Sequence, residues 1–320
     1  MTGPPDLSPI KKGAPDSTPE SAPLNTSEPT EKSVADRIVR YEFLKSQQTE
    51  IIEHLLDVGE IKLAEKMLEC GTFLRFHEYM RLGKTALVGA NFCKQHIYCP
   101  LCAGRRASSA VTTYSQRLQH LFDEHQPLYA HLITHTVKNG DNLAERFMHL
   151  SRSLSTLFKR RTMPTRYPRS TFVASIAGIT AIEIKLGKNS DSWHPHAHTL
   201  VLSRRQTFDW HHCKMEWLEI TGDSRVVNFT ACDPSISLAI HAREVLKYCA
   251  KFGDLSPAQR HEVGTTLRRR PLYRPWGELR GLTLPESLCD SSLAGEPYIE
   301  TLWRWLGTCY TLQRHRVADS

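Results

Sequence analysis

The chain has 320 residues, 40% of them hydrophobic, which is enough to bury one sizeable core or a main domain with a smaller satellite. Lys and Arg outnumber Asp and Glu by 41 to 34, giving a formal charge of +7, the balance that a polyanion-binding surface needs. The first residues lack a basic segment followed by an apolar run, and no uncharged apolar stretch reaches the roughly 18 residues of a membrane span, so we expect a cytoplasmic protein with no membrane partner.

The N-terminal part is expected to begin as a tail and to continue as helices. Residues 1–34 are rich in Pro, Ser, Thr, Glu and Lys and contain no aromatic residue, so they cannot bury enough surface to offset their ordering entropy. We therefore expect a disordered tail. From residue 34 to residue 68 the apolar residues recur at helical spacing, and Gly59 interrupts them, which predicts two helices.

A cysteine-bearing loop is expected at residues 70–102. Nine cysteines in a reducing compartment are more typical of thiols or metal ligands than of disulfides. The last three of the loop have the spacing C-x5-C-x2-C, and four thiolates can close a tetrahedral structural Zn²⁺ site. His77 or His96 could replace the first cysteine, and the alternative is a set of buried free thiols. The expected zinc ligands are Cys70, Cys93, Cys99 and Cys102.

Basic residues lie beside this loop. Arg105 and Arg106 follow the last cysteine directly, and Lys94 lies inside the loop. Together they would form a surface suited to DNA phosphates. The alternative is the solvated start of the helix that the sequence predicts from about Arg105.

The rest of the chain alternates between strand and helix patterns. Asp141 is the expected N-cap of the first helix in this part. Strands interleaved with helices and containing a hairpin predict an α+β fold of split βαβ type, a central antiparallel sheet with flanking helices on one face. After residue 271 we expect an irregular segment that ends in a short helix at 299–312. The expected elements are a strand at 128–139, a helix at 141–161, strands at 172–186 and 194–203, and helices at 208–222 and 236–252.

Three histidines lie in the second strand of the expected hairpin. Residues two apart in a strand point to the same face, so His196 and His198 can converge on one cation. His194 falls on that face too, but a proline leaves it at the strand entrance. Glu183 in the adjacent apolar strand is the candidate carboxylate, since a charge among isoleucines needs a partner. The alternative is a group of hydrogen-bonded histidines without a metal.

A tyrosine lies in the last predicted helix of this part. Helical geometry sets Glu244 four residues before Tyr248 and Lys251 three after it, so the three share one face. A tyrosine with a pKa near 10 needs cations or a base before it can act as a nucleophile. Lys247 and Lys251 could supply the cations and Glu244 the base. Alone, this helix has an ordinary explanation, a packed tyrosine beside a solvated ion pair.

Together, these motifs resemble the HUH endonucleases, and more closely the Rep initiators of small rolling-circle plasmids of Gram-positive type. The matching motifs are the strand and turn at 132–139, the histidines at 194–198 and the pattern E-x-x-K-Y-x-x-K from Glu244 to Lys251. The resemblance includes the cysteine segment and covers about residues 70–252. Relatives with two active tyrosines exist, but no second tyrosine lies near Tyr248.

The resemblance implies a nicking enzyme that uses one tyrosine. His196, His198 and Glu183 would hold a divalent ion, Mg²⁺ or Mn²⁺, in an antiparallel sheet. Tyr248 would attack one DNA strand at the plasmid origin and form a 5'-phosphotyrosyl intermediate. Glu244 would activate water in the terminating cleavage, and a host helicase and polymerase would be further partners.

The sequence therefore predicts a rolling-circle replication initiator that nicks and rejoins one strand at the double-strand origin. The expected parts are a disordered tail at 1–34, a helical and cysteine-rich DNA-binding module at 35–125, an HUH nicking domain at 126–270 and an irregular segment at 271–320. Two alternatives stay open. One is a transposase or relaxase of the same class, although relaxases commonly place the tyrosine near the N-terminus. The other is a non-catalytic zinc-dependent DNA-binding regulator, which would tolerate Phe in place of Tyr248.

Overall fold

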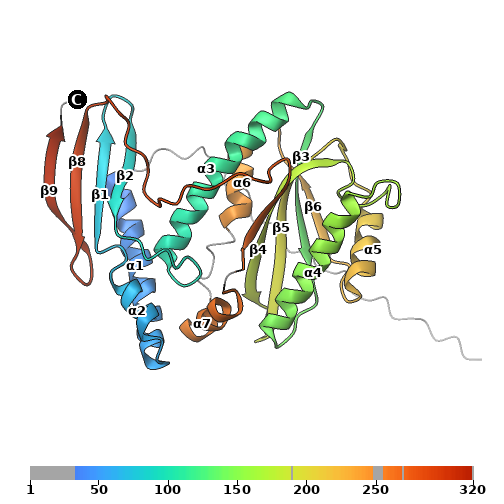
Figure 1. Cartoon of the computed structure of the whole chain (residues 1–320), viewed down its shortest axis with the longest axis horizontal. Helices are drawn as coiled ribbons and strands as arrows, with labels where there is room; N and C mark the ends of the chain where they lie inside the picture. The colour runs from blue at the N-terminus through green and yellow to red at the C-terminus, as the bar shows by residue number, and fades with distance from the viewer. Residues whose placement is uncertain (1–32, 189, 248–254, 269, 319–320) are drawn as a thin grey trace, which may run out of the picture.

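The computed structural model describes residues 33–188, 190–247, 255–268 and 270–318. It contains two antiparallel sheets, and Figure 1 shows the long helix α3 running between them. The five-stranded sheet has the strand order β6-β3-β5-β4-β7. Its strands are β3 (Tyr129–Thr136), β4 (Ser175–Leu186), β5 (Trp193–Ser203), β6 (Val227–Ala231) and β7 (Tyr273–Gly277). This confirms the α+β class and the expected β4–β5 hairpin.

Helices cover both faces of the five-stranded sheet, whereas the sequence predicted helices on one face only. Directly paired residues of antiparallel strands share a face, so the register assigns each side chain to a side. On the face that carries the histidines of β5, Tyr114 of α3 meets Tyr273 of β7. On the opposite face, Phe158 of α4 packs on Trp276 of β7. The helices are α3 (Pro100–Glu124) and α6 (Leu238–Leu246) on the first face, and α4 (Leu143–Arg161) and α5 (Trp210–Thr221) on the second.

A four-stranded sheet joins the two ends of the described chain (Figure 1). Its order is β2-β1-β8-β9, and Leu74 of β1 lies opposite Trp303 of β8. One face packs on α1, and the cysteines lie in the same hydrophobic core. The elements are α1 (Val34–Asp57), α2 (Ile61–Leu68), β1 (Phe73–Tyr79), β2 (Lys84–Ala90), β8 (Tyr298–Trp305) and β9 (Tyr310–Ala318), with α7 (Pro257–Thr266) near α1.

Two expectations about this region are wrong. The short helix at 299–312 is instead the hairpin β8–β9, and the cysteine-bearing loop contains β1 and β2. Ile299, Leu302 and Trp303 have helical spacing, but pairing with β1 decides the conformation, because the strand buries one face against the N-terminal core.

A smaller correction concerns α4, where Asn142 rather than Asp141 is the N-cap. The Asn142 side chain accepts a hydrogen bond from the Glu145 amide.

The hydrophobic residues form two clusters that share α3. Leu101 and Cys102 at its start belong to the core of the four-stranded sheet, and Tyr114 and Leu118 further along belong to the core of the five-stranded sheet. We propose two modules on this basis, an N-terminal module completed by β8 and β9, and a sheet module built on β3–β7. Among the described residues, no helix is both long and apolar enough to cross a membrane.

A buried histidine makes the sheet module sensitive to acid. His135 is 1% exposed and lies between the rings of Phe172 and Trp217, and burial lowers its pKa to about 3. The unfolded chain therefore binds a proton below about pH 6.5 that the folded chain does not. We expect the free energy of unfolding to fall by about 1.4 kcal/mol per pH unit from this residue as pH drops from about 6 to 4.

Urea unfolding of wild type and His135→Leu across this pH range checks the expectation. The variant should lose part of the pH dependence, whereas His120→Leu, which changes an exposed histidine on α3, should keep it. Equal slopes in all three proteins would contradict the assignment.

Candidate functional site

The candidate metal ligands meet on the face of the sheet that α6 covers. His196 on β5 lies directly opposite Glu183 on β4, and His198 lies opposite Ala181. Both histidines are partly buried, and the Glu183 side chain is 5% exposed. The small Ala181 leaves room beside His198, whose Nε2 lies 3.2 Å from Oε2 of Glu183. The sheet therefore brings together the three groups that the sequence singled out.

Two threonines of β3 hold the histidine rings. The hydroxyl of Thr136 is hydrogen-bonded to Nδ1 of His196 at 3.2 Å, and that of Thr134 to Nδ1 of His198 at 3.1 Å. Each threonine lies directly opposite its histidine in the β3–β5 register. In the tautomer whose Nδ1–H donates to the hydroxyl, Nε2 carries the lone pair that can bind a cation. A hydrogen-bonded Nδ1 is the arrangement that metal-binding histidines commonly show.

The Nε2 atom of His196 is buried and has no hydrogen-bond partner among the described residues. Burial, and then the neighbouring His194, lowers the pKa of His196 to about 2, so the ring is neutral at physiological pH. A buried, unprotonated nitrogen without a partner fits a divalent cation. His196, His198 and Glu183 are not a closed cluster, however, since in the described chain the only set of ligand atoms all within 4.8 Å of one another is the cysteine set.

Helix α6 covers the face of the sheet that carries this site, and an ion pair lies at its C-terminal end. It packs against β4 and β5 on the histidine face, and Glu244 and Lys247 form an ion pair one helical turn apart. The Glu244 side chain is 22% exposed and that of Lys247 is 44% exposed. Tyr248 and Lys251, the predicted nucleophile and second cation, lie outside the described residues.

The four cysteines form the compact metal-type cluster that their spacing predicted. Cys70 follows α2, Cys93 follows β2, Cys99 is the N-cap of α3, and Cys102 lies in its first turn. Sγ of Cys70 is 3.5 Å from that of Cys99 and 3.6 Å from that of Cys102. A zinc tetrahedron with Zn–S bonds of about 2.3 Å has edges of about 3.8 Å, so these separations suit one ion at the centre.

Two buried polar side chains of α1 contact this cluster. Lys45 is 4% exposed and donates to the carbonyls of Leu68 and Cys70, at 3.3 and 2.6 Å. Gln48 is fully buried and its Nε2 lies 3.4 Å from Sγ of Cys99. Burial holds the pKa of Lys45 below its usual value, and the nearby cysteines oppose this shift because thiolates would favour the charged lysine. The residues present therefore fit a structural metal.

Comparison with known proteins places the chain in a family. The family model of Rep_1, described as replication protein, matches residues 84–272. The chain belongs to the Rep_1 family. Its matched region contains β3, β4 and β5 with their threonines and histidines, and also α6.

The relatives that the chain matches are all described as Protein rep. One from a Bacillus species is 29% identical over 53% of this chain and 53% of its own length, and one from Streptococcus pneumoniae is 30% identical over 46% and 43%. A shorter protein from Staphylococcus aureus is 27% identical over 66% of this chain and 92% of its own length. The chain thus spans about half the length of the first curated relatives it matches. No solved structure matches it.

The basic residues predicted to contact DNA have different surroundings in this Rep_1 member. The Arg105 guanidinium donates to the carbonyl of Leu288 at 2.7 Å and to Asp290 at 2.5 Å, and its side chain is 12% exposed. It therefore fastens the C-terminal segment to α3, and we leave it out of the proposed DNA surface. Arg106 is partly buried and lines a cavity, and Lys94 is exposed.

Sequence reasoning missed the residues that support both sites. Thr134 and Thr136 alternate in the strand before the histidines, which is the available signal that they share one face. Lys45 and Gln48 occupy positions on the apolar side of the first predicted helix. A lysine and a glutamine among buried residues indicate a polar group to be satisfied, but the sequence does not say which one.

Proposed function

We propose that the protein initiates plasmid replication by nicking one strand of origin DNA and remaining covalently attached to it. Membership of the Rep_1 family supports the role in replication. The observation that carries the nicking chemistry is the buried, unpartnered Nε2 of His196 beside His198 and Glu183, on the sheet face that α6 covers. That arrangement suits a catalytic cation more than a structural hydrogen-bond network.

The proposed reaction is a transesterification at phosphorus. A divalent ion, Mg²⁺ or Mn²⁺, held by His196, His198 and Glu183, would neutralise negative charge on the phosphate. The hydroxyl oxygen of Tyr248 forms a bond to phosphorus as the bond to the 3' oxygen breaks. The products are a 5'-phosphotyrosyl end and a free 3' hydroxyl, which takes the proton and can serve a host polymerase once a helicase opens the duplex.

The charged residues between positions 244 and 251 have separate roles in this scheme. Lys247 and Lys251 lower the cost of forming the phenolate of Tyr248. Glu244, held by its ion pair with Lys247, is the general base that takes a proton from water when the covalent bond is hydrolysed at the end of a round. Tyr248 is the single nucleophile in this proposal.

We propose that the cysteine cluster holds structural Zn²⁺. Four thiolates would close its coordination, and Lys45 would offset part of their charge. The ion would tie α2, the segment after β2 and the start of α3 into one unit. Lys94, within the cysteine segment, would then lie at the edge of a fixed DNA-facing loop.

The outer face of the four-stranded sheet is the proposed contact for duplex origin DNA. The side chain of Arg75 lies on the side of β1 that does not pack on α1. Leu302 of β8 and Arg314 of β9 share this outer face with it, and Arg316 lies two residues further along β9. These arginines and Arg304 are exposed. The acidic residue Glu300 also lies on this outer face, with its Oε2 4.0 Å from Nε of Arg75. Such a face has the charge that a phosphate backbone needs.

Replacing both Arg314 and Arg316 with Gln is expected to weaken binding of duplex origin DNA and to lower the slope of log K against log salt by about 2, since each phosphate contact contributes about 0.9. Nicking of a single-stranded origin oligonucleotide should stay unchanged. Filter binding over a salt series measures the slope. The matched control is the double change Arg152→Gln and Lys159→Gln on α4, which removes the same charge elsewhere. An equal effect of the control would show that net charge, not this face, matters.

The decisive test of the proposed function is whether DNA becomes covalently attached to Tyr248. The protein is incubated with Mn²⁺ or Mg²⁺ and supercoiled DNA that carries its plasmid origin, beside a Tyr248→Phe variant. We expect a covalent protein–DNA adduct with the wild type and none with the variant. If wild type binds the DNA but forms no adduct, the nicking mechanism is wrong and a zinc-dependent DNA-binding regulator is favoured.

A further inference from the structure

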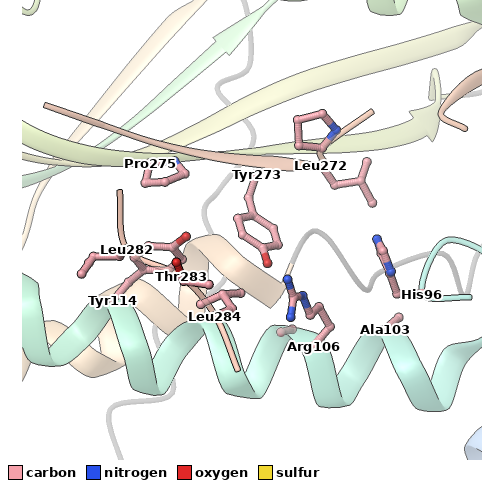
Figure 2. Close-up of a pocket in the computed structure, with 12 residues that line it drawn as sticks. His96, Ala103, Arg106, Tyr114, Leu272, Tyr273, Pro275, Leu282, Thr283 and Leu284 are labelled. Carbon is pink, nitrogen blue, oxygen red and sulfur yellow. The ribbon is translucent and has the colours of Figure 1, made fainter. Parts of the chain in front are cut away.

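A cavity lies between α3 and β7, on the same face of the sheet as the histidines. It has a volume of about 440 Å³, within the range of roughly 300–1,000 Å³ that small-molecule sites occupy. Its walls come from α3, from β7 with the residues just before it, and from the segment at 282–284. Figure 2 shows Tyr273 extending from β7 toward α3, and Arg106 extending from α3 toward it.

The lining consists mostly of apolar and aromatic side chains, with Arg106 as its cation. Leu272, Leu282, Leu284 and Pro275 supply aliphatic walls, and Tyr114 and Tyr273 supply aromatic ones. Arg106 supplies a positive charge to the cavity (Figure 2), whereas burial lowers the pKa of His96 and favours its neutral form. Among the described residues, the Arg106 guanidinium donates one hydrogen bond, to the carbonyl of Pro285, out of the five donors it has. A ligand that joins a flat apolar group to an anion would therefore fit the cavity, with the flat group against the apolar and aromatic walls and the anion at Arg106.

The register relates the cavity to the candidate metal ligands. Tyr273 on β7 lies directly opposite Ala181 on β4, and Ala181 lies directly opposite His198 on β5. The three residues therefore form one row across the sheet and point to the same side. Two strand spacings separate Tyr273 from His198, about 10 Å. A single strand whose phosphate lies at the histidines can place a nearby base in the cavity.

We propose that this cavity binds one nucleotide of the single-stranded DNA, with its base stacked against Tyr273 and its phosphate contacted by Arg106. The inference rests on the proposed function only in taking single-stranded DNA as the substrate. Stacking on an aromatic ring tolerates any base, so the cavity fixes the position of the strand more than its sequence. It would thereby hold the strand in place beside the histidines.

Binding can be measured separately from cleavage by placing all variants in a full-length Tyr248→Phe background. The probe is a short homothymidine strand carrying 5-iododeoxyuridine, which is photo-crosslinked to the protein and mapped by mass spectrometry. We expect cross-links in the peptides that contain Tyr273 or Tyr114. Tyr273→Leu should raise the Kd for the strand about 5- to 140-fold, the range for loss of one base–aromatic stack, while Tyr273→Phe should stay within about twofold of the parent.

Two further variants separate the cavity from general aromatic and charge effects. Arg106→Gln should raise the Kd and make it less dependent on salt. Trp210→Leu, which removes an exposed aromatic ring on α5 at the opposite face, should leave the Kd unchanged. Cross-links confined to other peptides, or equal affinities for Tyr273→Leu and Tyr273→Phe, would overturn the proposal. Stacking in the cavity without any nicking by the wild type would instead overturn the proposed function alone.

Discussion

Replacing His196 or His198 with Ala is expected to lower metal-dependent nicking at least about 100-fold and to leave duplex binding intact, because duplex binding is assigned to the other sheet. Thr136→Val should have a smaller effect, about 10- to 100-fold, since it removes only the hydrogen bond that orients the His196 ring. Nicking is measured as conversion of supercoiled to open-circular DNA over a Mn²⁺ titration, and duplex binding by filter retention.

The histidine and threonine variants are compared because replacing a histidine can lower nicking simply by disturbing the fold. His120→Ala, an exposed histidine on α3, is the matched control and should behave as wild type in both assays. Loss of nicking and duplex binding together in His196→Ala would point to misfolding or to a wrong site assignment. Full nicking by His196→Ala and His198→Ala would make the histidine strand structural.

Changing Cys70 or Cys102 to Ser is expected to remove about one bound zinc per chain and to unfold the N-terminal module, since structural Zn²⁺ contributes folding free energy directly. The metal content is measured on the purified protein, and loss of the module is followed by limited proteolysis. We expect cleavage to appear in α1, α2 and the four-stranded sheet before it appears in β3–β5. Chelation of the wild type should give the same pattern.

Cys309→Ser provides the control for this experiment, because Cys309 is an exposed free cysteine that is not part of the cluster. It should keep both the metal and the protease resistance. A wild type that contains no zinc, and whose cluster variants are as resistant as Cys309→Ser, would contradict the assignment of a structural metal.

The sequence predicted the sheet module better than the N-terminal module, for a physical reason. In β4 and β5 the apolar residues form long runs joined by a short polar turn, so local pattern and tertiary pairing agree. Strand β8 is different, because its partner β1 lies more than 200 residues away in the chain. Nothing local in residues 299–312 distinguishes a helix from a strand that must pair at that distance.

The candidate site was predictable to the extent that it depends on strand periodicity and cysteine spacing. Alternation placed His196 and His198 on one face, and the C-x2-C turn identified the cluster. The surroundings of Arg105 could not be predicted in this way. Its basic neighbours in the sequence indicate a phosphate contact, whereas in the folded chain its guanidinium binds Asp290. That ion pair joins segments 185 residues apart, and only the folded chain brings them together.

The pairing of β1 with β8 also sets the order in which the molecule can be assembled. A chain is made from its N-terminus, so β1 and β2 emerge early, but a two-stranded hairpin alone is only marginally stable in water. All five strands of the sheet module, from Tyr129 to Gly277, are made before Tyr298 begins β8. The arginine-bearing face is therefore completed last, and a chain still being synthesised would possess the histidine site before it possesses the surface proposed to hold duplex DNA.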